Sequence, residues 1–374
     1  MIDAAAHFSQ TYGEARDRFL GAARARGCRL AAHVHPDAKG PDGGELAIDV
    51  ATAGDDDARA VLFISSGTHG VEGHAGSGIQ HAWLQDDDAW GRIDGQQVRV
   101  VLLHALNPWG FAHDARGDEN NVDLNRNFRD FGVAQSINEG YAALHPLLVP
   151  DAWPPPWTTE ARLWLAILRQ GTRSVQAAIS RGQCEFADGL FYGGAAASWS
   201  NETLRAIVGG EARGRAAVGW VDLHTGLGRR GAAEVIFNGR NDARDLARAR
   251  RWWGDRVTSM YDGSSVSIDV AGSNYQALHA AAIESSAAVT VELGTRPPRT
   301  VLDALRARQW LCNHPDAPAV QRRAILAQSR AAFCVDDDVW KWLRGRVLVA
   351  ARTTERGERG AIERPERVLR AREH

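Results

Sequence analysis

The segment VLFISSGTHGVEG, residues 61–73, joins an apolar run to a glycine-rich turn that carries one histidine and one glutamate. Residues 61–66 are nearly all apolar, as in a strand that helices cover on both faces. A Gly/Ala-rich helix is predicted to follow over residues 73–84, because the glycines allow a tight bend before it. His69 and Glu72 therefore stand at the end of a buried strand, where α/β folds present functional groups.

The same alternation of short apolar runs and helical patterns extends over most of the chain, which is typical of α/β proteins. We predict strands at residues 45–50, 61–66, 97–104, 217–223, 234–238 and 287–292. We predict helices at residues 1–27, 73–84, 160–180, 201–211, 242–258, 275–282 and 300–311. The predicted fold class is α/β, with a mixed, mostly buried central sheet flanked by helices on both faces.

No internal repeat and no linker with a change of composition divides the sequence, so we expect one domain over residues 1–352. Residues 146–157 contain five prolines and two tryptophans and are predicted to be an irregular insertion. This insertion is either a surface connection or part of the rim of a pocket. Residues 353–374 are highly charged, and we expect them to form a mobile tail.

Charge and composition argue against several classes of protein. The chain of 374 residues has 44 basic and 46 acidic residues, so it has no overall field that would attract nucleic acid or an anionic membrane. Its four cysteines are scattered, which argues against a disulfide framework or a cysteine metal site. Neither a long apolar stretch nor a secretory signal is found. We expect a cytoplasmic protein, and the sequence leaves its oligomeric state open.

The spacing of His69 and Glu72 suits two ligands of one metal ion, because side chains three positions apart on a turn face the same point. This pair alone is a weak signal. His224, in the segment VDLHTG, again ends an apolar strand and supplies a third ligand. Three protein ligands leave one position of a tetrahedral zinc ion for water, as in catalytic sites. We therefore predict one Zn²⁺ per chain.

Glu292 ends the apolar run AVTVEL, so its carboxylate is predicted to lie close to the core. Burying a carboxylate without a partner costs a free energy of roughly several kcal/mol, so Glu292 needs a partner. A water molecule at the metal would be such a partner, and Glu292 would then act as the general base. The alternative is a structural salt bridge.

Two arginines, Arg116 and Arg126, lie in the polar segment DARGDENNVDLNRNF, residues 114–128. A guanidinium beside a metal site stabilises the oxyanion of a tetrahedral intermediate or binds a substrate carboxylate. Arginines also serve as ordinary surface or salt-bridge residues, so this segment by itself leaves both readings open.

These motifs, in their order along the chain, resemble those of the zinc carboxypeptidases, whose fold is also used by succinylglutamate desuccinylases and aspartoacylases. The matching elements are GTHGVEG, RGDENNVDLNRNF, VDLHTG and VELGT, which span residues 67–295. The resemblance implies that His69, Glu72 and His224 bind zinc and that Glu292 is the base and proton shuttle. It therefore agrees with the interpretation of the individual residues.

The resemblance adds roles that the residues alone do not establish. It implies that Arg116 polarises the scissile carbonyl and that Asn125 and Arg126 hold a free carboxylate of the substrate. One element of the family has no clear counterpart here, namely the tyrosine that closes over the substrate. Tyr261 and Tyr275 are the candidates, and neither aligns well with the family pattern.

The function that follows is hydrolysis of an amide bond by a zinc carboxypeptidase-like catalytic domain acting on a small peptide with a free carboxylate. The first alternative is a deacylase of N-acyl amino acids or other small amides, which the segments GTHG and DLHTG and the missing tyrosine favour. The second alternative is a zinc-containing binding protein without activity, which the intact Glu292 disfavours.

Overall fold

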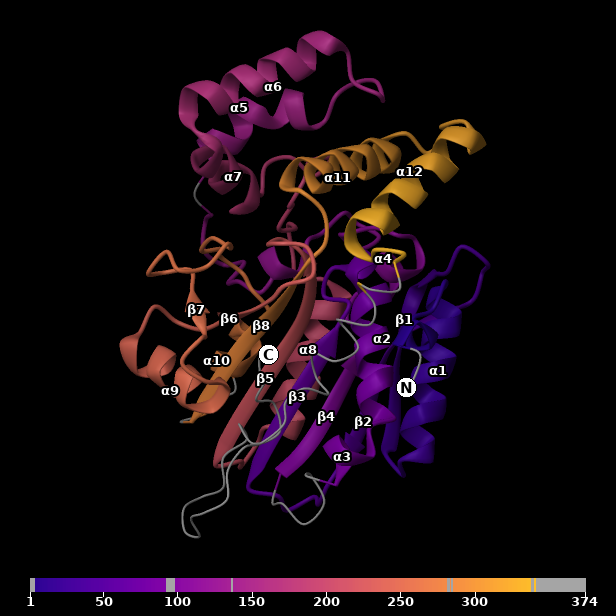
Figure 1. The fold of residues 1–374 in the computed structure, drawn as a ribbon, viewed down its shortest axis with the longest axis vertical. Helices are drawn as coiled ribbons and strands as arrows, with labels where there is room; N and C mark the ends of the chain where they lie inside the picture. The colour runs from indigo at the N-terminus through magenta and orange to yellow at the C-terminus, as the bar shows by residue number, and fades with distance from the viewer. Residues whose placement is uncertain are drawn as a thin grey trace.

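A mixed sheet of eight strands runs through the centre of the described part of the protein (Figure 1). The computed structural model describes residues 4–91, 98–135, 137–280, 283, 285–337 and 340. The strands lie in the order β1 (Arg29–Lys39), β2 (Glu45–Ala53), β4 (Val98–His104), β3 (Ala60–Ser66), β5 (Ala217–Gly226), β8 (Ser286–Gly294), β6 (Ala233–Phe237) and β7 (Thr258–Ser259). Strands β4, β3, β5 and β8 are mutually parallel, and the pairs β1–β2, β2–β4 and β6–β8 are antiparallel.

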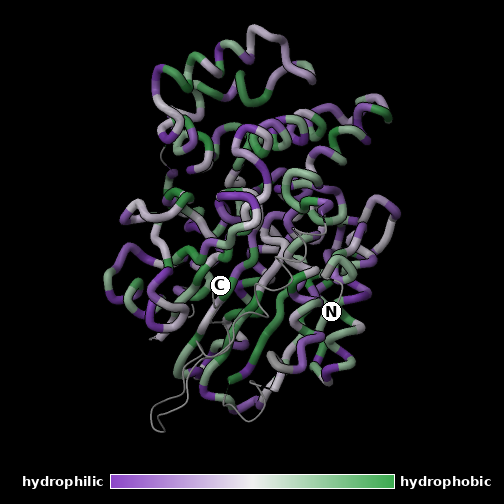
Figure 2. Tube along the Cα trace, viewed as in Figure 1, coloured by the Kyte–Doolittle hydropathy of each residue, from purple (hydrophilic) through white to green (hydrophobic). Residues whose placement is uncertain are grey.

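Helices cover both faces of the sheet because the central strands are apolar on both sides. Along β3, Leu62 and Ile64 pack into one core cluster, whereas Val61 and Phe63 pack into another. The first face is covered by α1 (Tyr12–Ala25), α2 (Gly73–Leu84) and α9 (Ala243–Trp253), and the second by α8 (Trp199–Glu211) and α10 (Gln276–Ala280). Figure 2 shows hydrophobic residues concentrated along the central strands. The predicted fold class is confirmed.

A separate group of helices lies above the sheet in Figure 1. It consists of α5 (Glu139–Leu148), α6 (Trp157–Gln170), α7 (Thr172–Ser180), α11 (Pro298–Asn313) and α12 (Ala319–Phe333). Their apolar side chains form one cluster that also contains Val71, which follows the end of β3. These helices therefore cover the carboxyl ends of the parallel strands, where the candidate functional residues lie.

The remaining elements are short. They are η1 (Ala4–His7), η2 (Gly70–Glu72), α3 (Asp87–Trp90), α4 (Pro108–Ala112) and η3 (Leu124–Arg126). None of the helices in the described ranges is both long and apolar enough to cross a lipid bilayer.

Several predicted boundaries are wrong for identifiable reasons. The single helix predicted at residues 160–180 is two helices, because Gly171 has a φ of +85° and ends α6. The helix predicted at 242–258 ends at Trp253, since Gly254 has a φ of +96°. Pro146 lies inside α5, so the irregular segment is shorter than predicted. The expected tail, residues 353–374, lies outside the described residues, and the single domain stays a prediction.

Candidate metal site

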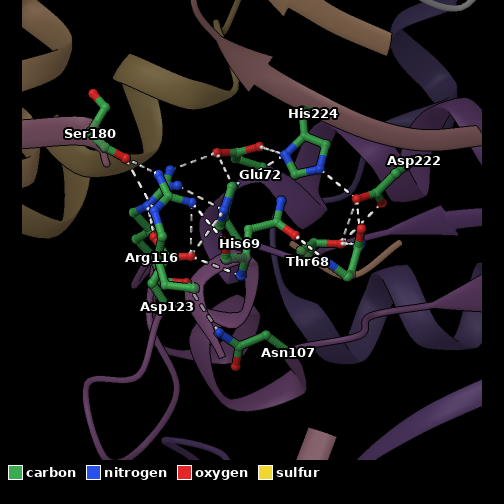
Figure 3. A network of polar contacts seen from close by, with 12 residues as sticks. Thr68, His69, Glu72, Asn107, Arg116, Asp123, Ser180, Asp222 and His224 are labelled. Atoms are coloured by element: carbon green, nitrogen blue, oxygen red, sulfur yellow. Dashed lines mark hydrogen bonds and ion pairs between the residues drawn. The ribbon is translucent and has the colours of Figure 1, made fainter. Parts of the chain in front are cut away.

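Three side chains from two parts of the sheet converge on one point. His69 directly precedes η2, Glu72 is the last residue of η2, and His224 lies near the end of the adjacent strand β5. The distances are 2.9 Å from His69 Nδ1 to Glu72 Oε1, 3.1 Å from His224 Nδ1 to Glu72 Oε2 and 3.1 Å between the two Nδ1 atoms (Figure 3). All three side chains are buried. The structure thus brings the three predicted ligands together.

The arrangement of these donor atoms fits a small divalent cation. Zinc–nitrogen bonds of about 2.0–2.1 Å at tetrahedral angles would separate neighbouring donors by roughly 3.3 Å, close to the spacing found here. Burial opposes ionisation of Glu72, but the neighbouring His69 and His224 outweigh it and hold the pKa of this carboxyl below its ordinary value. A set of two imidazoles and one carboxylate is also typical of catalytic zinc sites. The residues therefore fit the predicted metal.

Asp222 orients the imidazole of His224 from behind. Its Oδ2 lies 2.6 Å from His224 Nε2, which places a proton on that nitrogen and turns Nδ1 toward Glu72 and His69. Ser65 and Asn274 donate hydrogen bonds to the same carboxylate at 2.6 and 2.7 Å. Asp222 is thus fixed in place beside His224.

Arg116 touches the cluster from the opposite side. Its Nε donates to Asp123 Oδ2 at 2.8 Å, its Nη1 donates to Glu72 Oε1 at 3.3 Å, and its Nη2 lies 2.7 Å from His69 Nε2. A guanidinium only donates, so His69 Nε2 accepts here and its proton lies on Nδ1. Binding of a cation by Nδ1 requires the proton on Nε2, where Asp123 Oδ1 lies 3.4 Å away. Arg116 must therefore move slightly when a metal binds.

Glu292 lies beside the cluster on strand β8. It is the register partner of His224, and its Oε1 accepts a hydrogen bond from the backbone N–H of Leu227 at 2.8 Å. Burial, together with the negative charge of Glu72, raises the pKa of Glu292 to about 7. Within the described ranges it forms no ion pair, so the structure does not contain the salt bridge considered above. A carboxyl with such a pKa suits proton transfer at neutral pH.

Two cavities lie around the segment that carries Arg116. The inner cavity, of about 30 Å³, is lined by Arg116, Asp123, Phe191 and Phe333 among others. The outer cavity, of about 920 Å³, lies between α1, α4, α11 and α12. The two cavities share the lining residues Asp118, Asn121, Arg308 and Cys312. The proline-rich residues 146–157 line neither, so they are not part of these pocket walls.

Asn125 and Arg126 also line neither cavity. The guanidinium of Arg126 donates to the backbone carbonyls of Ser180 and Asn125 and is buried. The side-chain oxygen of Asn125 accepts a hydrogen bond from the backbone N–H of Asn274 at 3.0 Å. Arg126 Nη1 also lies 3.9 Å from Asp123 Oδ1, so both side chains have partners within the protein.

Phe191 is a feature of the site that the sequence did not indicate. Its ring lies 4.7 Å from the guanidinium carbon of Arg116 and 5.5 Å from that of Arg126, in cation–π contact with both. Its φ of +54° places this residue in the left-handed region. Tyr261 and Tyr275 line neither cavity, and the hydroxyl of Tyr261 donates to the carbonyl of Gly239. The aromatic residues that line the inner cavity are therefore phenylalanines, Phe191 and Phe333.

Comparison with known proteins gives one family and a set of distant structures. A family model described as "Protein of unknown function (DUF2817)" matches residues 8–344. No curated protein matches the sequence.

Solved structures similar to the chain include the carboxypeptidase A of Helicoverpa armigera, with 15% identity over 88% of this chain and 75% of that one and a TM-score of 0.44. Bovine thrombin-activatable fibrinolysis inhibitor matches with 10% identity over 87% and 97% of the two chains and a TM-score of 0.47. The succinylglutamate desuccinylase of Chromobacterium violaceum matches with 17% identity over 85% and 73% and a TM-score of 0.33. Carboxypeptidases and desuccinylases are also the enzymes that the sequence motifs resemble.

Proposed function

We propose that this chain, which belongs to the DUF2817 family, is a zinc-dependent hydrolase of amide bonds. The observation that carries the proposal is the convergence of His69 Nδ1, Glu72 Oε1 and Oε2 and His224 Nδ1, with the Glu292 carboxylate on the neighbouring strand. A structural zinc site would use more thiolate ligands and would not need an additional carboxyl whose pKa lies near neutrality. The arrangement therefore supports a catalytic centre.

Each residue has a defined task in this proposal. Zinc, when bound by His69, Glu72 and His224, lowers the pKa of water and polarises a carbonyl group. Glu292 removes a proton from the attacking water and delivers it to the nitrogen of the leaving amine as the C–N bond breaks. The Arg116 guanidinium, released from His69, donates hydrogen bonds to the substrate oxygen as it gains negative charge.

The first candidate substrate is a small peptide with a free C-terminal carboxylate, as for a metallocarboxypeptidase. One observation favours the second candidate, an N-acyl amino acid or another small acylated amine. Arg126, which the family resemblance assigns to a substrate carboxylate, is bound to the Ser180 carbonyl, and no tyrosine considered above lines the inner cavity. Amide hydrolysis is common to both candidates.

The proposal is tested by metal content and turnover in the same preparations. Wild type, Glu292→Gln and His69→Ala would be loaded with zinc and assayed against C-terminally free peptides and N-acyl amino acids. Glu202→Gln and His314→Ala are the controls, because Glu202 is exposed on α8 and His314 contacts the Trp310 carbonyl outside the cluster.

We expect about one zinc per chain in wild type, in Glu292→Gln and in both controls, and little in His69→Ala. Turnover should be lost in the two site variants and kept in the controls. Full turnover by Glu292→Gln would refute the assignment of the base. Bound zinc without turnover of any amide would instead support the binding protein.

A further inference from the structure

Arg308, on α11, is a buried arginine whose guanidinium contacts only uncharged groups. It is 9% exposed, and it donates to the carbonyls of Asp114 and His113 at 3.2 and 3.1 Å and to Cys312 Sγ at 2.7 Å. In the described part of the chain no carboxylate lies within ion-pair distance of it. Removing a guanidinium from water without a counter-charge is unfavourable. Arg308 therefore offers a positive charge to whatever enters the cavities that it lines.

Two other buried arginines of the chain, in contrast to Arg308, form hydrogen bonds with carboxylates. Arg99 donates to Glu211 at 2.6 Å, and Arg306, two positions before Arg308 on α11, donates to Glu160 at 2.8 Å. The pairing of these arginines makes the lack of an acidic partner at Arg308 distinctive. A counter-anion for Arg308 has to come from outside the described chain.

Asp118 supplies a second unsatisfied group in the same place. It is 3% exposed, and its Oδ1 accepts hydrogen bonds from the backbone N–H groups of Asn120 and Val122 at 2.9 and 2.8 Å. Its Oδ2 is buried and has no hydrogen-bond partner. Buried carboxylate oxygens are normally paired, so this oxygen is an acceptor for a donor that is not part of the protein. Asp118 and Arg308 line both cavities.

The outer cavity has the size and lining of a small-molecule site. Its volume of about 920 Å³ falls in the range of roughly 300–1,000 Å³ that ligand pockets occupy. Tyr12, Trp109 and Phe111 contribute apolar wall, as is usual for such pockets. Another cationic group on this wall, Arg330, is already paired with Asp114 at 2.8 Å. The outer cavity thus combines apolar wall with a buried donor group, on Arg308, and a buried acceptor, Asp118 Oδ2, that lack charged or hydrogen-bonding partners, respectively, among the described residues.

We infer that the outer cavity binds a small ligand with both a carboxylate and an N–H donor, such as an N-acyl amino acid or a short peptide. The carboxylate lies on Arg308, and the N–H group donates to Asp118 Oδ2, which accepts when this carboxyl is ionised. The binding of this ligand does not depend on the proposed function. The claim that the ligand is also the substrate that is hydrolysed does rest on it. That identification follows from the inner cavity, where Asp118 and Arg308 share a lining with Arg116.

Binding is tested by calorimetry on the full chain treated with a chelator, so that neither turnover nor a bound metal contributes. The probe is N-acetylglycine, which has one carboxylate and one amide N–H. Its methyl ester lacks the charge, and N-acetyl-N-methylglycine lacks the N–H. The protein variants are Arg308→Gln, Arg308→Lys and Asp118→Asn, with Arg322→Gln as the control for another arginine on the cavity wall. Thermal unfolding checks that each variant is folded.

N-acetylglycine should bind to wild type and to Arg322→Gln with the same affinity. Affinity should fall at least tenfold, roughly, in Arg308→Gln and with either altered probe, because a charged or buried hydrogen bond is lost in each case. Arg308→Lys should keep part of the affinity, and Asp118→Asn should lose it, since its amide would face the N–H of the probe. Equal binding of acid and ester, unchanged binding by Arg308→Gln, or no saturable binding at millimolar probe would overturn the inference.

The outcomes for the two proposals are separable. Binding that depends on Arg308, combined with the absence of turnover in the zinc-loaded protein, would contradict the hydrolase and leave the binding site standing. Turnover that depends on Glu292, without binding that depends on Arg308, would contradict the inference and leave the hydrolase standing.

Discussion

At the scale of single residues, the two imidazoles of the candidate metal site differ in the hydrogen-bond partners of their Nε2 atoms. His224 has its proton fixed by Asp222, whereas His69 contacts Arg116 and only more distantly Asp123. His224 Nδ1 therefore already faces the other candidate ligands. His69 has to exchange tautomers before it can bind a cation, so the two histidines contribute unequally to the preparation of the site.

This difference predicts that Asp222→Asn weakens zinc binding by about 10–100-fold, because the charge that fixes the His224 tautomer is lost. Competition with a chromophoric chelator measures the affinity. Ser65→Ala is the matched control, since it removes one hydrogen bond to Asp222 without touching His224. Unchanged zinc affinity in Asp222→Asn would show that Asp222 has no orienting role.

The environment of Asp118 leads to a second prediction at the scale of single residues. It concerns how the free energy of unfolding changes with pH. Burial, together with the nearby Glu119, raises the pKa of Asp118 from 3.8 to about 7. Between these two pKa values the folded chain holds a proton on Asp118 that the unfolded chain has released. The contribution of Asp118 to the free energy of unfolding is therefore fully present below about pH 4, and it falls as the pH rises toward 7. The slope is at most about 1.4 kcal/mol per pH unit.

The measurement is urea unfolding of wild type and Asp118→Asn between acidic and neutral pH. The amide that Asp118→Asn introduces does not titrate, so the variant should gain stability relative to wild type as the pH rises through this window. A difference between the two proteins that stays constant with pH would show that Asp118 titrates normally in the folded state.

At the scale of elements, the short helix η2 depends on its close contact with α4. A Cβ atom on Gly70 would lie 2.0 Å from the carbonyl carbon of Gly110 and 2.3 Å from the backbone nitrogen of Phe111. α4 cannot easily move away, because Asn107 accepts a hydrogen bond from the Gly110 N–H and donates one to the Arg116 carbonyl. Gly70 therefore holds the turn that carries both His69 and Glu72.

We predict that Gly70→Ala lowers the free energy of unfolding by about 3 kcal/mol or more and also weakens zinc binding, because both ligands must shift. Gly209→Ala on α8 is the control. No atom lies within 4 Å of its added Cβ, so it should stabilise the chain by about 0.5–1 kcal/mol. Urea unfolding and zinc titration measure the two effects. Wild-type zinc affinity in Gly70→Ala would mean that this contact does not position the ligands.

The elements that the sequence predicts best are those whose pattern is local. The helix predicted at residues 73–84 is α2 with the same bounds, since a buried strand, a glycine turn and an apolar helix follow one another directly. β1 was not predicted, because it is an edge strand and most of its side chains are at least partly exposed. The break at Gly171 was also missed, since the sequence around it remains helical on both sides.

The candidate site likewise has features that the sequence predicts and features that it does not. The positions of His69 and His224 were predictable because the carboxyl ends of neighbouring parallel strands meet. The contacts of Arg126 with Ser180 and of Phe191 with Arg116 were not, because they join residues 54 or more positions apart without a repeating pattern. The surroundings of the candidate ligands therefore include contacts that only the folded structure shows.

At the scale of the whole molecule, the candidate metal ligands connect segments that are distant in the sequence. Glu72 accepts a hydrogen bond from the Thr225 N–H on β5 at 3.0 Å, and Phe333 at the end of α12 lines the inner cavity. The site is thus joined to the first half of the sheet, to the second half and to the helices above them. A cation bound there links parts of the fold that separate on unfolding.

We therefore predict that removal of zinc lowers the melting temperature of the whole chain in one cooperative step. A ligand present at a thousandfold excess over its Kd stabilises the folded state by about 4 kcal/mol, which corresponds to a shift of roughly 5 °C or more for a large domain. Scanning calorimetry with and without chelator measures the shift. His224→Ala should melt at the same temperature under both conditions, because it cannot hold the ion. An equal response of wild type and His224→Ala to the chelator would place the stabilising metal outside the His69–Glu72–His224 cluster.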